Sequence, residues 1–294
     1  MTRGSEASPR EMRWEIDGLS LAGLAWGPES GTPVLALHGW MDHAASFAEL
    51  APRLTGCRVV ALDLSGQGLS GHRAAHASYN IWDDLPQIAG LLDVLGWPDC
   101  VLLGHSRGAN IAGLFAAAQP HRVRALVALD SLVPEPVPEE AVIETLRAFI
   151  EEGRARQAAS PRVYDAPEGY IARRMRQGNA RAVAEALSER ALEPSPGGFR
   201  LRGDARHFAS SAVKLTRGQV EAVLRALRCP VLNIWASEGV RHSRRMPGDP
   251  AQLGHALVAD YTSLEIAGDH HFHMEPRAAG EIASAIEAFL ARLG

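Results

Sequence analysis

The stretch from residue 101 to residue 115 limits the fold of this chain more than any other part of the sequence. An apolar run typical of a buried strand leads into the pattern G-x-S-x-G, and a helical pattern follows directly. A turn this sharp strains the backbone of its central residue, Ser106, and leaves no room for a Cβ on Gly104 or Gly108. It holds the hydroxyl of Ser106 out at the end of a strand, beside a helix N-terminus that stabilises negative charge. The stretch therefore predicts a nucleophilic serine at the edge of a sheet.

Short apolar runs and helical patterns alternate along most of the chain. The runs are nearly continuous, which suits strands buried on both faces, as in parallel sheets. They cover residues 33–38, 58–63, 100–104, 125–130, 230–235 and 261–266. Helical patterns cover residues 46–54, 80–95, 107–119, 216–226 and 276–293. Residues 12–17 and 21–26 alternate around Gly18, as in a β-hairpin. Together these patterns predict an α/β fold with a doubly wound, mostly parallel sheet of eight strands.

The regular alternation breaks between residues 134 and 214. This stretch opens with three prolines in five residues and contains helix-like segments at residues 139–152 and 179–192. Long connections without structure are uncommon between strands of one sheet, and apolar residues recur here at helical spacing. We therefore expect a helical cap at 134–214 on a core made of residues 12–133 and 215–294, with residues 1–11 unstructured.

Composition restricts the class of protein. Hydrophobic residues make up 46% of the 294 residues and charged residues 22%, as in globular proteins with a full core, and the net charge of −4 does not indicate nucleic-acid binding. No apolar run approaches the roughly 18 residues of a membrane helix, and the first twelve residues lack the apolar core of a signal peptide. Cys57, Cys100 and Cys229 lie beside predicted buried strands, as reduced core cysteines do. We expect a cytoplasmic protein without nucleic-acid or membrane partners, and the sequence does not indicate its oligomeric state.

A nucleophilic serine needs a base, and three candidates lie in the loop of residues 268–276, namely His270, His271 and His273. Together with the serine motif, this loop resembles the α/β-hydrolase superfamily, in which it holds the catalytic histidine. The superfamily pattern, G-x-H with a glutamate five residues on, fits His270 and Glu275. The resemblance thus implies His270 as the base, with the other two as alternatives. No cysteine lies nearby and no two of these histidines are spaced i, i+4, so we expect no metal.

The same resemblance implies the groups that would bind the oxyanion of a reacting carbonyl. One is the backbone N–H of Arg107, the residue after the serine. The other comes from the loop after the apolar strand of residues 34–37, where the superfamily has the pattern H-G-x. Here the pattern is His38-Gly39-Trp40, which makes Trp40 the implied donor.

The acid that orients the histidine has two candidates. In most of the superfamily it follows the strand read here as residues 230–235, but Gly239 stands at the usual aspartate position and Glu238 is one residue early. Asp130 ends the strand after the serine helix, a position used by a subset that includes many haloalkane dehalogenases. That subset tends to have Gly-Val or Gly-Leu after the later strand, as Gly239-Val240 does. We therefore expect Asp130 as the acid and keep Glu238 as the alternative.

Residues 66–71 satisfy the dinucleotide-binding pattern G-x-G-x-x-G, and Asp84 lies near the distance expected for a ribose-binding acid. That fold requires the glycines to join a strand directly to a helix, and residues 72–77 show no helix with an apolar face. The segment of residues 63–70 instead resembles the D-x-x-G-x-G-x-S loop of α/β-hydrolases. We expect no nucleotide cofactor.

Residues 37–47, 197–200 and 215–220 resemble the serine hydrolase-like esterases within the superfamily. This implies a serine hydrolase that cleaves a small-molecule carboxylic ester through an acyl-enzyme intermediate, without a cofactor. Serine at position 106 argues against dehalogenation and epoxide opening, for which relatives use aspartate. Thioesterase, C–C bond hydrolase and acyltransferase are alternatives on the same fold, and a ligand-binding, receptor-like protein is the alternative from another class. The Arg107 side chain could hold charge near an acidic substrate, whereas the polar neighbours of the basic run 241–245 favour a solvated loop.

Overall fold

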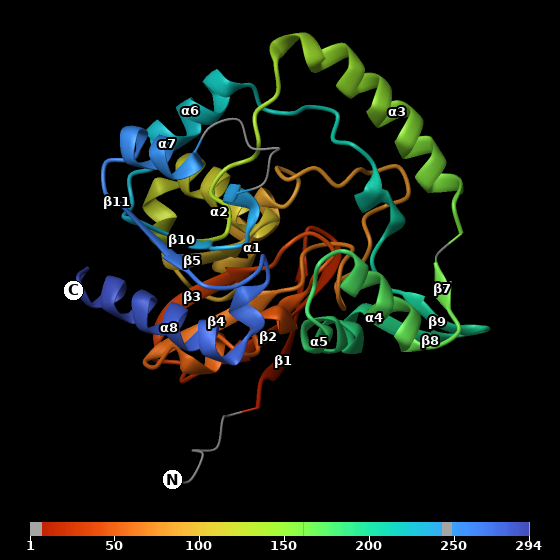
Figure 1. The fold of residues 1–294 in the computed structure, drawn as a ribbon, viewed down its shortest axis with the longest axis horizontal. Coiled ribbons are helices and arrows are strands. Elements are labelled where there is room, and N and C mark those ends of the chain that lie inside the picture. The colour runs from red at the N-terminus through yellow and green to blue at the C-terminus, as the bar shows by residue number, and fades with distance from the viewer. Residues whose placement is uncertain (1–7, 161, 243–248, 294) are drawn as a thin grey trace.

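The computed structural model describes residues 8–160, 162–242 and 249–293. Its centre is one eight-stranded sheet in the order β1-β2-β4-β3-β5-β6-β10-β11 (Figure 1). The strands are β1 (Arg10–Ile16), β2 (Leu19–Trp26), β3 (Thr32–Leu37), β4 (Cys57–Leu62), β5 (Cys100–His105), β6 (Val123–Leu129), β10 (Val231–Ala236) and β11 (Tyr261–Ile266). The hairpin β1-β2 is antiparallel, as is its pairing with β4, and the remaining pairs are parallel. The predicted fold class is confirmed.

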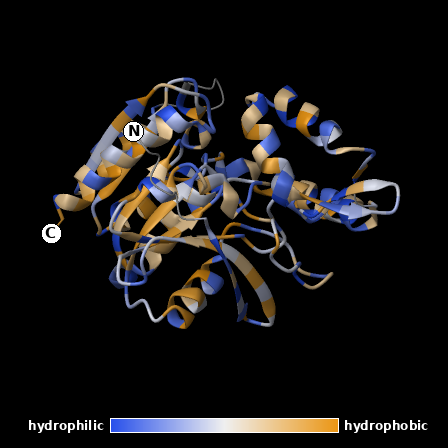
Figure 2. Ribbon diagram, turned by 90° about the horizontal axis from the view of Figure 1, so that it is seen from below, coloured by the Kyte–Doolittle hydropathy of each residue, from blue (hydrophilic) through white to orange (hydrophobic). Residues whose placement is uncertain are grey.

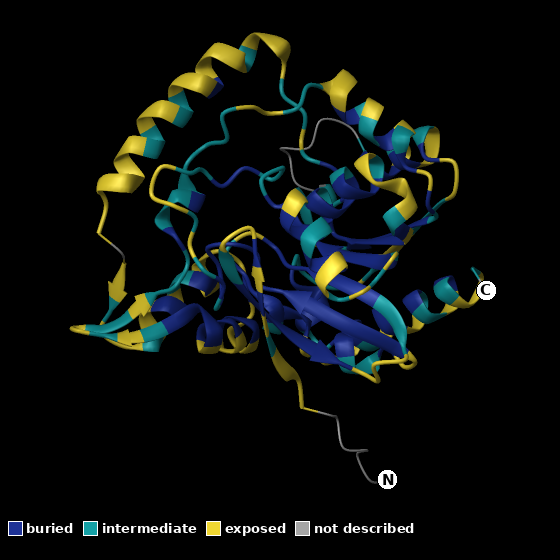
Figure 3. Ribbon diagram, turned by 180° about the vertical axis from the view of Figure 1, so that it is seen from behind, coloured by how far each residue is buried: buried dark blue, intermediate teal, exposed yellow. Residues whose placement is uncertain are grey.

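Two apolar cores lie on opposite faces of this sheet. Side chains of successive strand residues point to opposite faces, so Leu35 of β3 joins one core while its neighbours Val34 and Ala36 join the other. The first core includes residues of α1 (Leu85–Val94), α2 (Arg107–Ala118) and α6 (Arg217–Ala226). The second includes residues of α8 (Pro276–Ala291). Figure 2 shows the central strands as the most hydrophobic part of the molecule, and Figure 3 shows them buried.

The ends of several elements differ from the sequence patterns. Residues 46–54 form no α-helix but two 3-10 turns, Ala44–Phe47 and Ala51–Arg53, of which the second contains Pro52. Helix α1 begins at Leu85 rather than at residue 80, because Pro86 is tolerated only in the first turn of a helix. Strand β1 begins at Arg10, so the expectation that residues 10 and 11 are unstructured is wrong: both pair with β2. Residues 1–7 lie outside the described residues. Helix α7 (Pro250–Leu257), which no pattern predicted, precedes β11.

The segment of residues 134–214, called the insertion below, contains helices α3 (Val142–Ala158), α4 (Pro167–Arg176) and α5 (Arg181–Ala191). It also contains a three-stranded antiparallel sheet that the sequence did not predict, with strands β7 (Val163–Tyr164), β8 (Leu192–Ser195) and β9 (Gly198–Leu201) in the order β7-β9-β8. Tyr170, Val183 and Leu187 form a small core with Met274, which belongs to the loop before α8. The insertion is thereby packed against the histidine loop, while α3 arches away from the sheet (Figures 1 and 3).

Candidate active site

Ser106 lies between β5 and α2 with φ 52° and ψ −119°, a backbone conformation that is uncommon for residues other than glycine. The two flanking glycines make the turn possible. A Cβ on Gly104 would lie 2.4 Å from the Ala109 Cα, and one on Gly108 would lie 2.0 Å from the Leu37 carbonyl oxygen. The turn is held in place by the Ser106 N–H, which donates to the Leu129 carbonyl at 3.0 Å.

Ser106, His270 and Asp130 form a continuous hydrogen-bonded line. The Ser106 Oγ lies 2.9 Å from the Nε2 of His270, and the Nδ1 of His270 lies 2.5 Å from the Asp130 Oδ2. Three separate segments supply these groups. Ser106 lies in the turn after β5, Asp130 directly follows β6, and His270 lies in the loop between β11 and α8. Because these strands are parallel, their carboxyl ends meet at one edge of the sheet. The geometry is that of a nucleophile, a base and an acid that orients the base.

Asp130 is fully buried, and its carboxylate accepts two backbone hydrogen bonds besides that of His270. The N–H of Ala236 donates to Oδ1 at 3.2 Å, and the N–H of Val240 donates to Oδ2 at 2.9 Å. Glu238, the alternative acid, has an exposed side chain on the same loop. The structure therefore brings Asp130 to the histidine and leaves Glu238 in solvent.

Trp40 and Arg107 lie where the oxyanion groups were expected, in the loop after β3 and at the first position of α2. Within the described part of the chain, neither backbone N–H has a hydrogen-bond acceptor, so both are free for a ligand. The indole of Trp40 donates to the His207 carbonyl at 3.0 Å, and its ring meets that of Phe208 edge-on with centroids 4.8 Å apart. These contacts join the Trp40 loop to the insertion.

The guanidinium of Arg107 donates to the Tyr79 carbonyl at 3.2 Å. Burial lowers the pKa of this guanidinium, and the nearby Asp84 carboxylate works in the opposite direction. Asp84 itself accepts from Ser65 at 3.1 Å and pairs with Arg73 at 3.3 Å. The Arg107 side chain thus belongs to a buried polar network beside the site.

His271 and His273, the alternative bases, have other partners. The His271 ring bonds to Asp42 and to Asn179 of the insertion, at 3.1 and 2.7 Å. His273 is buried against the rings of Phe47 and His105, with centroids 5.6 and 4.1 Å away. Burial, followed by His271, lowers the pKa of His273 to about 3. Of the three loop histidines, only His270 is hydrogen-bonded to Ser106.

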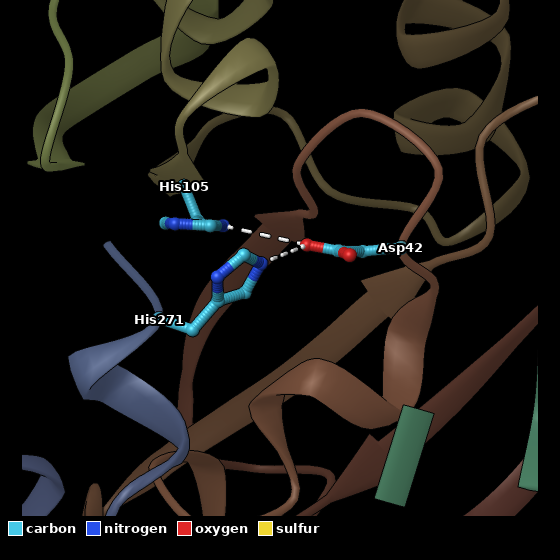
Figure 4. A group of neighbouring side chains, drawn as sticks. All are labelled: Asp42, His105 and His271. Atoms are coloured by element: carbon cyan, nitrogen blue, oxygen red, sulfur yellow. Dashed lines mark hydrogen bonds and ion pairs between the residues drawn. The ribbon is translucent and has the colours of Figure 1, made fainter. Parts of the chain in front are cut away.

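A polar cluster of Asp42, His105 and His271 lies beside the loop that holds His270, and its facing atoms lie within 4.8 Å of one another (Figure 4). Arg174 of α4 reaches into it and donates to the Asp42 Oδ1 at 2.7 Å. Burial alone would raise the pKa of Asp42, but His271 and Arg174 outweigh it and hold the pKa well below its usual value. On the other side, the Nε2 of His105 donates to the His270 carbonyl at 2.8 Å. The cluster therefore connects the Trp40 loop, the serine turn, the histidine loop and the insertion.

The donor set of this cluster does not suit a metal ion. The Nδ1 of His271 lies 2.7 Å from the Asn179 amide, and its Nε2 lies 3.1 Å from the Asp42 Oδ2 and 3.3 Å from the Arg174 guanidinium, so both ring nitrogens already have protein partners. The guanidinium of Arg174 already supplies the positive charge that the Asp42 carboxylate needs. The cluster is a buried ion-pair and hydrogen-bond network.

The loop of residues 63–70 is built around the carboxylate of Asp63, which accepts from the N–H groups of Ala44 and Leu69 at 2.7 and 2.8 Å. A Cβ on Gly68 would lie 2.3 Å from the Asp63 Cγ, which explains the second glycine of G-x-G. Helix α1 begins only at Leu85, so these glycines do not lead into a helix as those of a dinucleotide fold do.

Asp42, His105, Arg174 and Asn179 were not singled out from the sequence. Asp42 and His105 lie inside motifs that were recognised, so their positions were a usable signal. Arg174 and Asn179 lie in the insertion, where no pattern distinguishes them.

Of the basic run 241–245, Arg241 pairs with Asp249 at 2.8 Å, and residues 243–245 lie outside the described residues. No helix in the described ranges is long and apolar enough to cross a membrane.

Comparisons with known proteins identify the family of this chain. Residues 32–189, more than half of the chain, match the family model described as alpha/beta hydrolase fold. A serine hydrolase-like protein of Danio rerio is 30% identical over 290 residues, which cover 95% of this chain and 88% of that protein. A serine hydrolase-like protein of Dictyostelium discoideum is 30% identical over 277 residues, covering 88% and 75%. The crystal structure of a hypothetical protein from Pseudomonas aeruginosa PAO1 superposes with a TM-score of 0.89 at 36% identity, covering 96% of this chain and 99% of that one. The chain is therefore a hydrolase of the α/β-hydrolase family, related to the serine hydrolase-like proteins.

Proposed function

We propose that this hydrolase cleaves carboxylic esters of small molecules through an acyl-enzyme formed on Ser106. The observation that carries the proposal is the line in which the Ser106 Oγ lies 2.9 Å from His270 and His270 lies 2.5 Å from Asp130. Both distances are hydrogen-bond distances, so a proton can pass from the serine to the imidazole without a rearrangement.

In the first half of the reaction, the Nε2 of His270 takes the Ser106 proton while the Oγ attacks the ester carbonyl carbon. The carbonyl oxygen becomes an oxyanion, for which the N–H groups of Trp40 and Arg107 are free donors. The tetrahedral intermediate collapses when the C–O bond to the alcohol breaks, and His270 gives its proton to the departing alkoxide. The serine ester and the free alcohol remain.

In the second half, His270 takes a proton from water, and the resulting hydroxide attacks the acyl carbon. The Ser106 Oγ leaves and recovers the proton from His270, which releases the carboxylic acid. Throughout, Asp130 accepts the Nδ1–H of His270, fixing its tautomer and stabilising its protonated form. Every step uses groups of this chain and water.

We further propose that the insertion acts as a cap and that the protein works in the cytoplasm. The cap is supported by the contacts of the insertion with the Trp40 and histidine loops. The compartment is supported by Cys57, Cys100 and Cys229, which are buried and unpaired, as in proteins from reducing environments.

Labelling with a fluorophosphonate tests this function. By intact mass, the wild-type protein should gain one phosphonyl group and Ser106→Ala should gain none. In a separate assay, p-nitrophenyl esters of graded chain length should be hydrolysed by the wild type and not by Ser106→Ala. Wild-type protein that neither labels nor turns over any ester would refute the proposal and favour the receptor-like alternative. Labelling together with faster turnover of thioesters would favour a thioesterase.

A further inference from the structure

A large cleft separates the insertion from the core on the side of the Trp40 loop. Its volume is about 1210 Å³, above the roughly 300–1,000 Å³ of ordinary small-molecule sites. Residues 68–76 of the core form one wall, and the end of α3, α4 and β9 with the residues after it form the other. Figure 1 shows how α3 arches away from the sheet above this region. The cleft is thus built from both parts of the fold.

Arginine dominates the charged lining of the cleft. The two carboxylates of the lining belong to Glu193 and Asp204. Its six arginines are Arg156, Arg162, Arg173, Arg200, Arg202 and Arg206. The positive charge of the lining therefore exceeds the negative charge, although the whole chain has a net charge of −4.

Half of these arginines are already paired with the two carboxylates. Arg200 and Arg202 both pair with Glu193, and Arg206 pairs with Asp204 at 2.6 Å. The other half, Arg156, Arg162 and Arg173, make no ion pair with any carboxylate among the described residues. Three guanidinium groups in this cleft thus have no internal counter-charge.

Two of these unpaired arginines lie close to the candidate oxyanion loop. The guanidinium carbons of Arg156 and Arg173 lie 5.7 and 5.6 Å from the ring centre of Phe208. That ring in turn meets the indole of Trp40 with centroids 4.8 Å apart. The Phe208 ring therefore contacts both the unpaired guanidinium groups and the Trp40 side chain. A substrate with an anionic end in the cleft can therefore place its other end beside the catalytic loop.

We propose that the cleft binds the phosphorylated leaving group of the substrate, so that the enzyme prefers acyl esters or thioesters of a phosphorylated alcohol or thiol. The inference rests on the proposed hydrolysis at Ser106 and names its substrate class. Guanidinium groups bind phosphate oxygens through paired N–H donors, and phosphate groups carry enough charge to match several arginines. A monocarboxylate would match only one of the three, and the cleft is larger than a single phosphate requires.

The test compares thioesters that differ in the leaving group. Butyryl-coenzyme A carries phosphates, S-butyryl-pantetheine lacks them, and S-butyryl-glutathione carries carboxylates instead. Wild-type enzyme should show a kcat/KM for butyryl-coenzyme A at least about tenfold above that for the other two, since only its phosphates carry enough charge to match several arginines at once. Equal kcat/KM values for butyryl-coenzyme A and the pantetheine thioester would overturn the proposal. A higher kcat/KM for the glutathione thioester would also overturn it, because the cleft would then recognise carboxylate rather than phosphate.

The arginines are tested by R156Q/R173Q. Its KM for butyryl-coenzyme A should rise about tenfold or more, while p-nitrophenyl butyrate hydrolysis stays within about twofold. R156K/R173K keeps both charges but loses the paired N–H donors and should restore part of the affinity, which separates charge from packing against Phe208. R154Q is the matched control, because Arg154 is exposed on the same helix outside the cleft lining. An equal KM increase in R154Q, or an equal loss on the neutral ester, would refute the specific role of the pair.

Binding of coenzyme A to the Ser106→Ala variant, measured by calorimetry, separates this inference from the proposed function. In one outcome the wild type neither labels at Ser106 nor cleaves any ester, but it binds coenzyme A and R156Q/R173Q does not. The proposed hydrolysis is then refuted and the anion site is supported. If neutral esters are cleaved and coenzyme A does not bind, the function stands and the anion site is refuted.

Discussion

The carboxylate of Asp130 occupies the space that a side chain at position 239 would need. A Cβ built on Gly239 would lie 2.2 Å from the Asp130 Oδ1 and 2.3 Å from its Oδ2. An aspartate at 239, the usual position of the acid in this family, is therefore incompatible with a carboxylate at 130 in its present place. Glycine at 239 leaves the space that the carboxylate of Asp130, at the end of β6, occupies. This relationship supports the assignment of Asp130 over Glu238.

Asp130→Asn should lower kcat by about 10²–10⁴, because an amide of the same size favours the wrong tautomer of His270. Glu238→Gln should stay within about tenfold of the wild type, since its side chain is exposed and makes no contact with His270. Steady-state hydrolysis of p-nitrophenyl butyrate measures both. A severe loss in Glu238→Gln together with an active Asp130→Asn would reverse the assignment.

Gly239→Ala should also reduce kcat, without a change in any ionisable group. Its Cβ would push the Asp130 carboxylate out of line with His270, because the two cannot share the same space. Gly218→Ala, at a helical position where nothing lies within 4 Å of the added Cβ, is the control and should remain fully active. Full activity of Gly239→Ala would show that the acid tolerates displacement and would weaken the case for Asp130.

His270→Ala should be as inactive as Ser106→Ala, because groups that act as one unit fail together. His271→Ala should retain measurable kcat while losing stability, since it removes one buried hydrogen-bond partner from Asp42 and one from Asn179. Fluorophosphonate labelling rates, measured beside the urea unfolding midpoint, separate the two effects. An inactive but stable His271 variant beside an active His270 variant would contradict the assignment of the base.

The buried pair of Arg174 and Asp42 should anchor the insertion to the core. Arg174→Met leaves the Asp42 carboxylate buried without its cation and should cost about 3–5 kcal/mol in the free energy of unfolding. Arg176→Met, an exposed arginine two residues away in α4, is the control and should change stability by less than about 0.5 kcal/mol. Chemical denaturation measures both, and equal small effects would show that the pair has no such role. The double variant Arg174→Met/Asp42→Asn should lose less than the sum of the single variants.

His273 should make the folded state sensitive to mild acid. Its pKa is lowered to about 3 by burial, whereas in the unfolded chain it is near 6.5. As the pH falls below about 6.5, the unfolded state takes up a proton that the folded state does not, so this contribution to stability is present above pH 6.5 and is lost towards pH 3. The loss is at most about 1.4 kcal/mol per pH unit for one group.

His273→Leu should flatten this dependence between pH 6 and pH 4, because it removes the buried imidazole. Urea unfolding at several pH values measures the slope, and His121→Leu, at an exposed histidine, is the control. An unchanged slope in His273→Leu would show that other buried histidines account for the acid sensitivity.

Local chemistry made much of this protein predictable from sequence. The spacing of Gly104, Ser106 and Gly108 allows only a tight turn between strand and helix, and that turn presents the serine regardless of what surrounds it. Apolar runs must be buried on both faces, which requires a parallel sheet covered by helices. The position of the hydroxyl and the fold class were therefore determined by neighbours along the chain.

Only the tertiary structure decided how distant polar groups pair. Asp130 and Glu238 are both carboxylates at strand ends, and the choice between them depends on which one reaches the His270 ring. Arg174 contacts Asp42, which is 132 positions away along the chain, and Asn179 contacts His271, which is 92 positions away. Such contacts leave no periodic pattern, because a hydrogen bond depends on one pair of atoms in space, whereas apolar burial depends on whole faces of helices and strands.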